Sequence, residues 1–132
     1  MTDGPVEVYL VRHGETWFNK LDRVQGWCGT PLTPKGFAVA EAIGRAFAAG
    51  GVDFAAAYSG DMLRHHETMT SLLEGMGSEL RPVSLFGLRE MSFGAWEGMP
   101  NRFMWEAAYR VLGVSSTEEA LGAGHSLIDI YD

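Results

Sequence analysis

The 132-residue chain has little cysteine, a shortage of positive charge and no long apolar run. Its single cysteine, Cys28, excludes an internal disulfide and is typical of a reducing compartment. Lys and Arg number 10 against 17 Asp and Glu, a formal net charge of −7, which argues against nucleic acid because phosphate neutralisation requires a basic surface. No apolar stretch approaches the roughly 20 residues of a membrane span, and the N-terminus lacks the basic and apolar regions of a signal peptide. We therefore expect a cytoplasmic protein that binds neither nucleic acid nor membranes.

What remains is a soluble, globular composition of one-domain length. Apolar residues make up 46% of the chain and charged residues 20%. Because the net charge is negative, an anionic ligand has to be attracted by a local cluster of cations. We expect a single domain over residues 1–132, with a core over 1–98 and a helical segment over 99–132.

The order of apolar segments predicts an α/β fold. Strands are expected at residues 6–12, 52–59 and 80–86, the last at a sheet edge because Pro82 lacks a ladder donor. Residues 14–32 show no periodicity and are expected to form a long loop. The β-α-β-α-β order favours a three-layer fold, with a mostly parallel sheet and helices on both faces.

Helix ends are marked by capping residues. Thr33 followed by Pro34 predicts the start of a helix that ends at Gly50, and Asp61 can cap a second helix. After residue 98, Asn101 can cap a third helix, and the capping-box pattern at residues 116–119 a fourth. A further amphipathic helix is expected to start near residue 127.

Charged and polar residues follow the end of each expected strand. Arg12 and His13 follow the first strand, Arg64 lies in the first turn of the helix after the second, and Glu90 follows the third. Since ligands of open parallel sheets bind outside the carboxyl ends of the strands, these side chains should meet at one edge. Two guanidinium groups can hold a phosphoryl group, a neutral imidazole can attack phosphorus, and a carboxylic acid can protonate the leaving group.

Each of these residues also has an ordinary structural interpretation. A histidine after a strand is commonly a surface or core residue, Arg64 can be a solvated side chain, and Glu90 can pair with Arg89. His65 and His66 adjoin Arg64, but neighbouring helical positions do not face one another and no zinc-site spacing is present, so we predict no metal. Position in the sequence alone leaves both interpretations open.

Four motifs, which follow one another along the chain, favour the functional interpretation over the structural one. They are "RHGETWFN" (12–19), "QGWCGTPLTPKG" (25–36), "YSGDMLRHHET" (58–68) and "LREMSFGAWEG" (88–98). Together they resemble the histidine phosphatase superfamily, in its phosphoglycerate mutase-like branch. The matched family elements are R-H-G-E-[ST]-x-x-N, Q-G-x-x-D-x-P-L-T-x-x-G, S-x-D-x-x-R-x-x-x-T and L-R-E-x-x-F-G-x-W-E-G.

The resemblance implies a role for each matched position. His13 is the phosphorylated nucleophile, Glu90 is the proton donor, and Arg12 and Arg64 bind the phosphoryl group. Asn19 contributes to the phosphate pocket, and Gln25 and Gly26 lie on the loop over the substrate. The substrate is a small phosphorylated metabolite, and no cofactor is implied.

Within the family the sequence favours a phosphatase. Cofactor-dependent mutases usually carry E-R-H-Y where this chain has Glu90-Met91-Ser92-Phe93, so the charge that a second phosphate needs is missing. Two alternatives stay open: mutase-type phosphotransfer dependent on a cofactor, and a catalytically impaired phosphate-binding remnant.

The chain departs from the family pattern at two places. Gly29 stands where the family usually has Asp, and no strand ending in V-S-H-G, which carries a second phosphate-binding histidine, is present. His125 does not stand in a comparable context. We therefore expect an incomplete, C-terminally truncated family domain, whose segment 6–12 exposes an unpaired apolar edge prone to association with a second copy.

Overall fold

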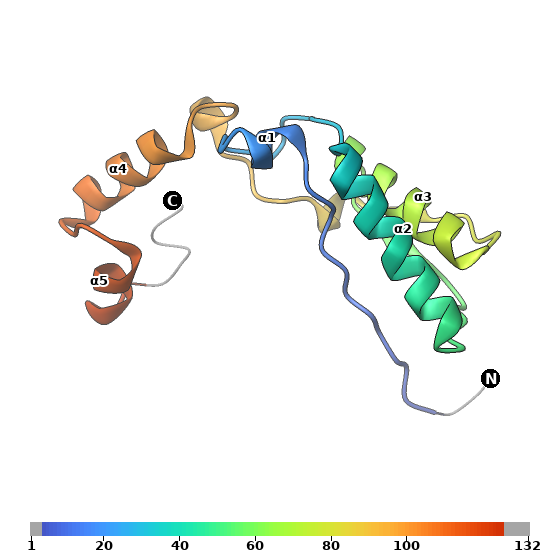
Figure 1. Cartoon of the computed structure of the whole chain (residues 1–132). Helices are drawn as coiled ribbons and strands as arrows, with labels where there is room; N and C mark the ends of the chain where they lie inside the picture. The colour runs from blue at the N-terminus through green and yellow to red at the C-terminus, as the bar shows by residue number, and fades with distance from the viewer. Residues whose placement is uncertain (1–3, 126–132) are drawn as a thin grey trace.

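The computed structural model describes residues 4–125 (Figure 1) and confirms the α/β class. Its longer helices are α2 (Pro34–Ala49), α3 (Leu63–Met76) and α4 (Asn101–Leu112), and its shorter ones are α1 (Trp17–Lys20) and α5 (Thr117–Gly122). The strands are β1 (Tyr58–Ser59) and β2 (Val83–Ser84), and the 3-10 turns are η1 (Phe86–Leu88) and η2 (Gly94–Trp96). The helix expected from residue 127 lies outside the described residues. Figure 1 shows α2 and α3 at one end, α4 and α5 at the other, and α1 between them.

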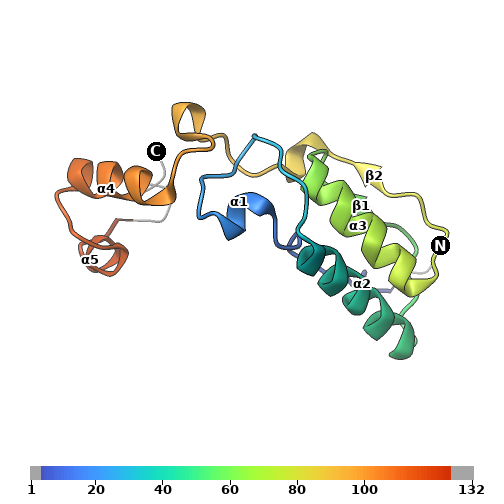
Figure 2. The ribbon, with the colours of Figure 1, turned by 45° about the horizontal axis from the view of Figure 1, so that its top comes forward.

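The sheet is parallel, as expected, but smaller than expected. β1 pairs with β2 in the register Tyr58↔Val83 and Ser59↔Ser84, and hydrogen bonds from Val83 N to Ala57 O and from Leu85 N to Ser59 O extend the ladder. The strands predicted at 52–59 and 80–86 are thus in place, although only residues 58–59 and 83–84 of them form the paired strands. α3 packs against β1, and α2 packs along α3 (Figure 2).

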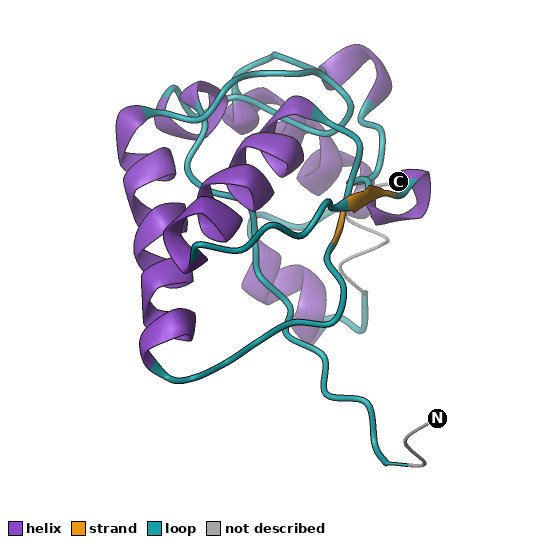
Figure 3. Cartoon of the chain, turned by 90° about the vertical axis from the view of Figure 1, so that its right-hand side faces the viewer, coloured by secondary structure: helices purple, strands orange, loops and turns teal. Residues whose placement is uncertain are grey.

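The first expected strand does not form among the described residues. Residues 6–12 run as an extended loop without backbone hydrogen bonds to the described part of the chain (Figure 3). Leu10 is 93% exposed and Val6 is 85% exposed, whereas Tyr9 packs edge-on against Phe47 and Phe54. The segment therefore alternates as a strand does, but it lacks the neighbour that would make it one. Within residues 4–125, Val6, Val8 and Leu10 of this segment are exposed apolar side chains.

Two of the predicted helix caps are correct. The Thr33 side chain accepts a hydrogen bond from Gly36 N, Pro34 is the first helical residue, and α2 ends at Gly50. Likewise, Ser116 caps α5 by accepting from Glu119 N. Both caps are local, because the capping oxygen and the amide it satisfies are three residues apart.

The other two predicted caps are wrong. Met62, not Asp61, is the N-cap of α3, because the Asp61 carboxylate binds Arg89 instead. Pro100 is the N-cap of α4, and Asn101 is the first helical residue, with its side-chain amide donating to Asp22. In addition, α1 forms inside the segment expected to be a loop, through a capping box between Thr16 and Asn19 that the sequence prediction missed.

The apolar core lies between α2, α3 and β1. Ala57, Leu72 and Leu73 form its buried centre, with Ile43 and Phe47 packed against them. The two helices approach closely because glycines face the neighbouring backbone. A Cβ at Gly44 would lie 2.0 Å from the Leu72 carbonyl oxygen, and one at Gly75 would lie 2.2 Å from the Glu41 oxygen. This packing fixes α3, which carries the central residues of the site.

Candidate active site

His13 lies half-buried at the end of the extended segment, with one ring nitrogen committed to the backbone. Its Nδ1 is 2.8 Å from the carbonyl oxygen of Gly14. A carbonyl oxygen only accepts hydrogen bonds, so Nδ1 carries the proton of the neutral ring and Nε2 keeps a free lone pair. The ring is thus held in the tautomer that a nucleophile at Nε2 requires.

The surroundings of His13 favour its neutral form. Burial lowers the pKa of His13 below its ordinary value of 6.5, and the nearby charges of Arg64 and Arg12 act in the same direction. The hydrogen bond to Gly14 and the carboxylate of Glu90 oppose this shift. The charges of Arg12, Arg64 and Glu90 therefore all act on His13.

Thr68 links the backbone beside His13 to α3. Its buried hydroxyl accepts from Gly14 N at 2.9 Å and donates to the carbonyl oxygen of Arg64 at 2.7 Å. Gly14 also packs so closely on α2 that a Cβ there would lie 2.8 Å from the Gly36 oxygen. The hydroxyl thereby sets the position of the His13 backbone relative to Arg64.

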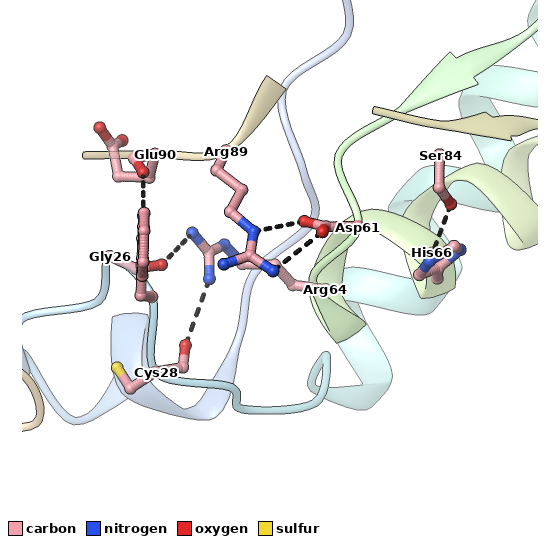
Figure 4. A network of polar contacts seen from close by, with 9 residues as sticks. Gly26, Cys28, Asp61, Arg64, His66, Ser84, Arg89 and Glu90 are labelled. Atoms are coloured by element: carbon pink, nitrogen blue, oxygen red, sulfur yellow. Dashed lines mark hydrogen bonds and ion pairs between the residues drawn. The ribbon is translucent and has the colours of Figure 1, made fainter. Parts of the chain in front are cut away.

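Arg64 is almost completely enclosed, at 1% exposure, and its guanidinium is held by the loop of residues 25–28. It donates to the carbonyl oxygens of Gly26 at 2.8 Å and Cys28 at 3.4 Å (Figure 4). With its amide oxygen facing the guanidinium, Gln25 accepts from Nε and Nη1 at 3.2 Å each. Gln25 and Gly26, which the sequence placed on a loop over the substrate, orient the Arg64 side chain here.

Asn19 is engaged in the capping box of α1. Its side-chain oxygen accepts from Thr16 N at 3.0 Å, and its backbone N–H donates to the Thr16 hydroxyl at 3.1 Å. The amide nitrogen of Gln25, in the orientation given above, then donates to the same hydroxyl. Among the described residues, Asn19 is connected to Arg64 only through Thr16 and Gln25.

Arg12 and Glu90 are the exposed members of the cluster. Within residues 4–125 the Arg12 side chain has no hydrogen-bond or ion-pair partner, so its donors are available to a ligand. The Glu90 carboxylate accepts from Met91 N at 2.9 Å, and its backbone carbonyl accepts from the indole nitrogen of Trp27 at 2.9 Å. The alternative pairing of Glu90 with Arg89 is wrong.

Arg89 instead forms a two-pronged ion pair with Asp61. Its Nε and Nη2 lie 2.5 and 2.8 Å from the two carboxylate oxygens, as Figure 4 shows. The Arg89 guanidinium also lies over the ring of Trp27, 4.9 Å from its centroid. Asp61 lies on the loop that precedes α3, and Arg89 is the neighbour of Glu90. The ion pair therefore holds the backbone beside Glu90 against that loop.

A cavity of about 220 Å³ opens beside His13, between residues 12–15 and α2. It is lined by Arg12, His13, Gly14, Glu15, Lys35, Gly36, Val39, Ala40, Ile43 and Thr68. Neither Arg64 nor Glu90 lines it, so the cavity is adjacent to the charged cluster without enclosing it.

The sequence prediction overlooked His65 as a neighbour of the site. Its ring centroid is 6.0 Å from that of His13, whereas the next residue, His66, bonds to Ser84 at 3.1 Å. Burial, with the charges of Arg64 and His13, lowers the pKa of His65 to about 4, so this ring is neutral near pH 7. No pattern in the sequence distinguishes the two adjacent histidines.

The described residues contain no group of three or more His, Cys, Asp or Glu side chains placed to hold a metal ion. None of the helices in the described part is long and apolar enough to cross a membrane. The cytoplasmic location remains a prediction from the sequence.

Comparison with known proteins links these motifs to a family. A family model described as the histidine phosphatase superfamily (branch 1) matches residues 8–132. The 2,3-bisphosphoglycerate-dependent phosphoglycerate mutase of Treponema pallidum is 33% identical over 95 residues, which cover 71% of this chain and 38% of that protein.

Solved structures show the same likeness. Phosphoglycerate mutase from Bacillus anthracis superposes with a TM-score of 0.80 at 36% identity, over 89% of this chain and 51% of that one. Phosphoserine phosphatase from Entamoeba histolytica, solved with 3-phosphoglyceric acid, gives a TM-score of 0.59 at 25% identity, over 85% and 49% of the two chains. The present chain thus spans about half the length of these solved structures, and less of the curated mutase.

Proposed function

This chain belongs to the histidine phosphatase superfamily, branch 1, and on that basis we propose that it hydrolyses a small phosphate monoester through a phosphohistidine at His13. The observation that carries the proposal is the hydrogen bond between His13 Nδ1 and the Gly14 carbonyl, because it leaves Nε2 unprotonated beside two guanidinium groups. The roles of Arg12, Arg64 and Glu90 are part of the same proposal.

In the first step, Nε2 of His13 forms a bond to phosphorus while the bond between phosphorus and the ester oxygen breaks. Arg12 and Arg64 stabilise the charge on the phosphoryl oxygens, and protonated Glu90 gives its proton to the leaving alkoxide. In the second step, water attacks phosphorus, its proton goes to Glu90, and the bond from phosphorus to Nε2 breaks. Inorganic phosphate and the free histidine result.

A mutase is the second candidate, because two of the proteins described above are phosphoglycerate mutases. The distribution of cations favours the phosphatase. Arg12 and Arg64 are the cations whose charges lower the pKa of His13, while Arg89 is bound to Asp61 and Lys35, at the cavity wall, lies 3.9 Å from Glu15. Two guanidinium groups suit one phosphate better than a ligand that carries two.

The proposal is tested by trapping the intermediate. The purified chain is mixed with a ³²P-labelled phosphate monoester and quenched in alkali, where phosphohistidine survives. We expect label on the wild type and on His66→Ala, a matched control at a histidine that bonds to Ser84, and none on His13→Ala. Hydrolysis by His13→Ala at the wild-type rate would refute the nucleophile.

Product analysis separates the three candidates. A phosphatase releases inorganic phosphate from 3-phosphoglycerate or another ester, whereas a mutase given a bisphosphorylated cofactor forms the 2-phospho isomer. A phosphate-binding remnant binds inorganic phosphate through Arg12 and Arg64 without acquiring label. We expect inorganic phosphate as the product.

A further inference from the structure

The carboxylate of Glu97 is surrounded by backbone amides from two segments. It accepts hydrogen bonds from Trp27 N at 2.7 Å and from Gly26 N, Cys28 N and Phe93 N at 3.1 Å each. Three of these four donors belong to consecutive residues of the loop that holds Arg64. Glu97 itself lies about 70 residues away, just after η2, so it joins two parts of the chain that are distant in sequence.

A carboxylate suits this position because every partner is a donor. Burial alone would raise the pKa of Glu97, but the hydrogen bonds from Cys28, Trp27, Phe93 and Gly26 outweigh it and hold the pKa at about 2. A neutral amide side chain would place its own donors against backbone donors. The contact is also close, since a Cβ at Gly26 would lie 2.2 Å from the Met91 oxygen and 2.6 Å from Glu97 Oε1.

The same loop connects Glu97 to the charged cluster. Gly26 and Cys28 donate their amides to Glu97. Their carbonyl oxygens accept from the Arg64 guanidinium, as Figure 4 shows. Trp27, between them, donates its indole N–H to the carbonyl oxygen of Glu90. Each residue of the loop is therefore held by Glu97 on one side and contacts a predicted site residue or its backbone on the other.

We propose that Glu97 is a positioning residue that clamps loop 26–28 and so orients both Arg64 and Glu90, without touching the substrate itself. Its effect on catalysis rests on the function proposed above, whereas the clamp is a property of the fold. The two can therefore be tested separately.

Cys28 reports on the clamp directly, because it lies in the loop and is the sole cysteine of the chain. Burial raises the pKa of the Cys28 thiol to about 11, and its neighbour Glu97 acts in the same direction. At pH 8 a thiol with this pKa is about 0.1% thiolate, while one at the ordinary value of 9.0 is about 9% thiolate. Because a thiolate also becomes less nucleophilic as its pKa falls, release of the loop should accelerate alkylation by iodoacetamide on the order of tenfold.

The variants separate release of the loop from loss of charge. Glu97→Gln keeps the size but removes acceptors, and Glu97→Asp keeps the charge but shortens the reach to the four amides. We expect alkylation to rise in both, on the order of tenfold in Glu97→Gln. Glu106→Gln, at an exposed glutamate of α4, is the matched control and should react like the wild type. Circular dichroism and thermal melting show which variants are folded. If Glu97→Gln does not fold, the alkylation rate of Glu97→Asp alone tests the clamp.

An alkylation rate within twofold of the wild type in both folded Glu97 variants would overturn the clamp. Phosphohistidine formation, followed in the same proteins, tests the coupling to the site. We expect at least a tenfold fall in kcat with a smaller change in KM, since Arg64 and Glu90 would be misplaced rather than removed. Faster alkylation with unchanged labelling would refute the positioning role. A wild type that acquires no label would count against the proposed function and leave the alkylation test decisive for the clamp.

Discussion

The hydroxyl of Thr68 is the group on which the placement of His13 depends most directly, and Thr68→Val removes it with little change of shape. In the wild type the hydroxyl accepts from Gly14 N and donates to the Arg64 carbonyl. The variant leaves the Gly14 amide without its partner next to a buried side chain, which costs about 1–3 kcal/mol of unfolding free energy. Because Gly14 adjoins His13, the ring also loses its fixed position. A misplacement on the order of 1 Å can slow a reaction about 100-fold.

Denaturation by urea measures the first effect, and the rate of phosphohistidine formation measures the second. Thr70→Val is the matched control, because Thr70 is exposed on the same helix and should change stability by less than about 0.5 kcal/mol. Thr68→Ser keeps the hydroxyl and should recover most of both properties. If Thr68→Val were as stable as Thr70→Val and acquired label as fast, the inference that the Thr68 hydroxyl positions His13 would be refuted.

Two further predictions concern the ionisation of His13 and the exposed edge. The pKa of His13 in the folded protein lies below 6.5, so its ring stays unprotonated as the pH falls through that value. We therefore expect the labelling rate to fall with decreasing pH only below pH 6.5. A fall that begins above pH 6.5 would contradict this. We also propose that residues 6–12 associate with a second copy of the chain, so light scattering should show a mass that rises with concentration and falls in Leu10→Lys. Val111→Lys, at an equally open position of α4 that is 86% exposed, is the control, and a wild type that stays monomeric at all concentrations would refute the edge.

The sequence predicted the helices well because their signals are local. Thr33, Pro34 and Gly50 mark the ends of α2 within a few residues of the atoms they satisfy. The failures at Asp61 and Asn101 have a common cause. Each of these side chains has a partner far away in sequence, Arg89 and Asp22 respectively, and no local pattern reveals that competition. A helix cap can be predicted from the sequence only when the capping side chain has no hydrogen-bond partner from a distant part of the chain.

The strands were predicted less well because a strand depends on its neighbours. Residues 6–12 have the apolar character and the alternation of a strand, and Tyr9 points to the core. No neighbour supplies backbone partners within the described residues, so the segment stays unpaired. Periodicity predicts which face is buried, whereas pairing is a property of the whole sheet.

The candidate site likewise has features that the sequence predicts and features that it does not. Topology was sufficient to expect His13, Arg12, Arg64 and Glu90 near one another, because they follow the ends of successive apolar segments. The bonds of Asn19 to Thr16, and the approach of His65 to His13, depend on side-chain directions that spacing does not give.

Several acidic residues of the motifs make hydrogen bonds that support the loops around the site. Glu15 accepts from the Thr33 hydroxyl at 2.7 Å, Glu67 accepts from Leu32 N at 2.7 Å, and Glu97 accepts from four amides. The reason is that the cluster lies on loops, whose amides have no ladder or helix to satisfy them and must find side-chain acceptors instead. A phosphate needs cations at the site, so acidic residues placed nearby gain nothing from facing it. Turned to the supporting loops, the same carboxylates satisfy amides and fix Arg64 and the backbone beside His13. The acidic residues of the motifs thus differ in the groups from which they accept hydrogen bonds. Glu90 differs from Glu15, Glu67 and Glu97 because its charge also acts on the pKa of His13.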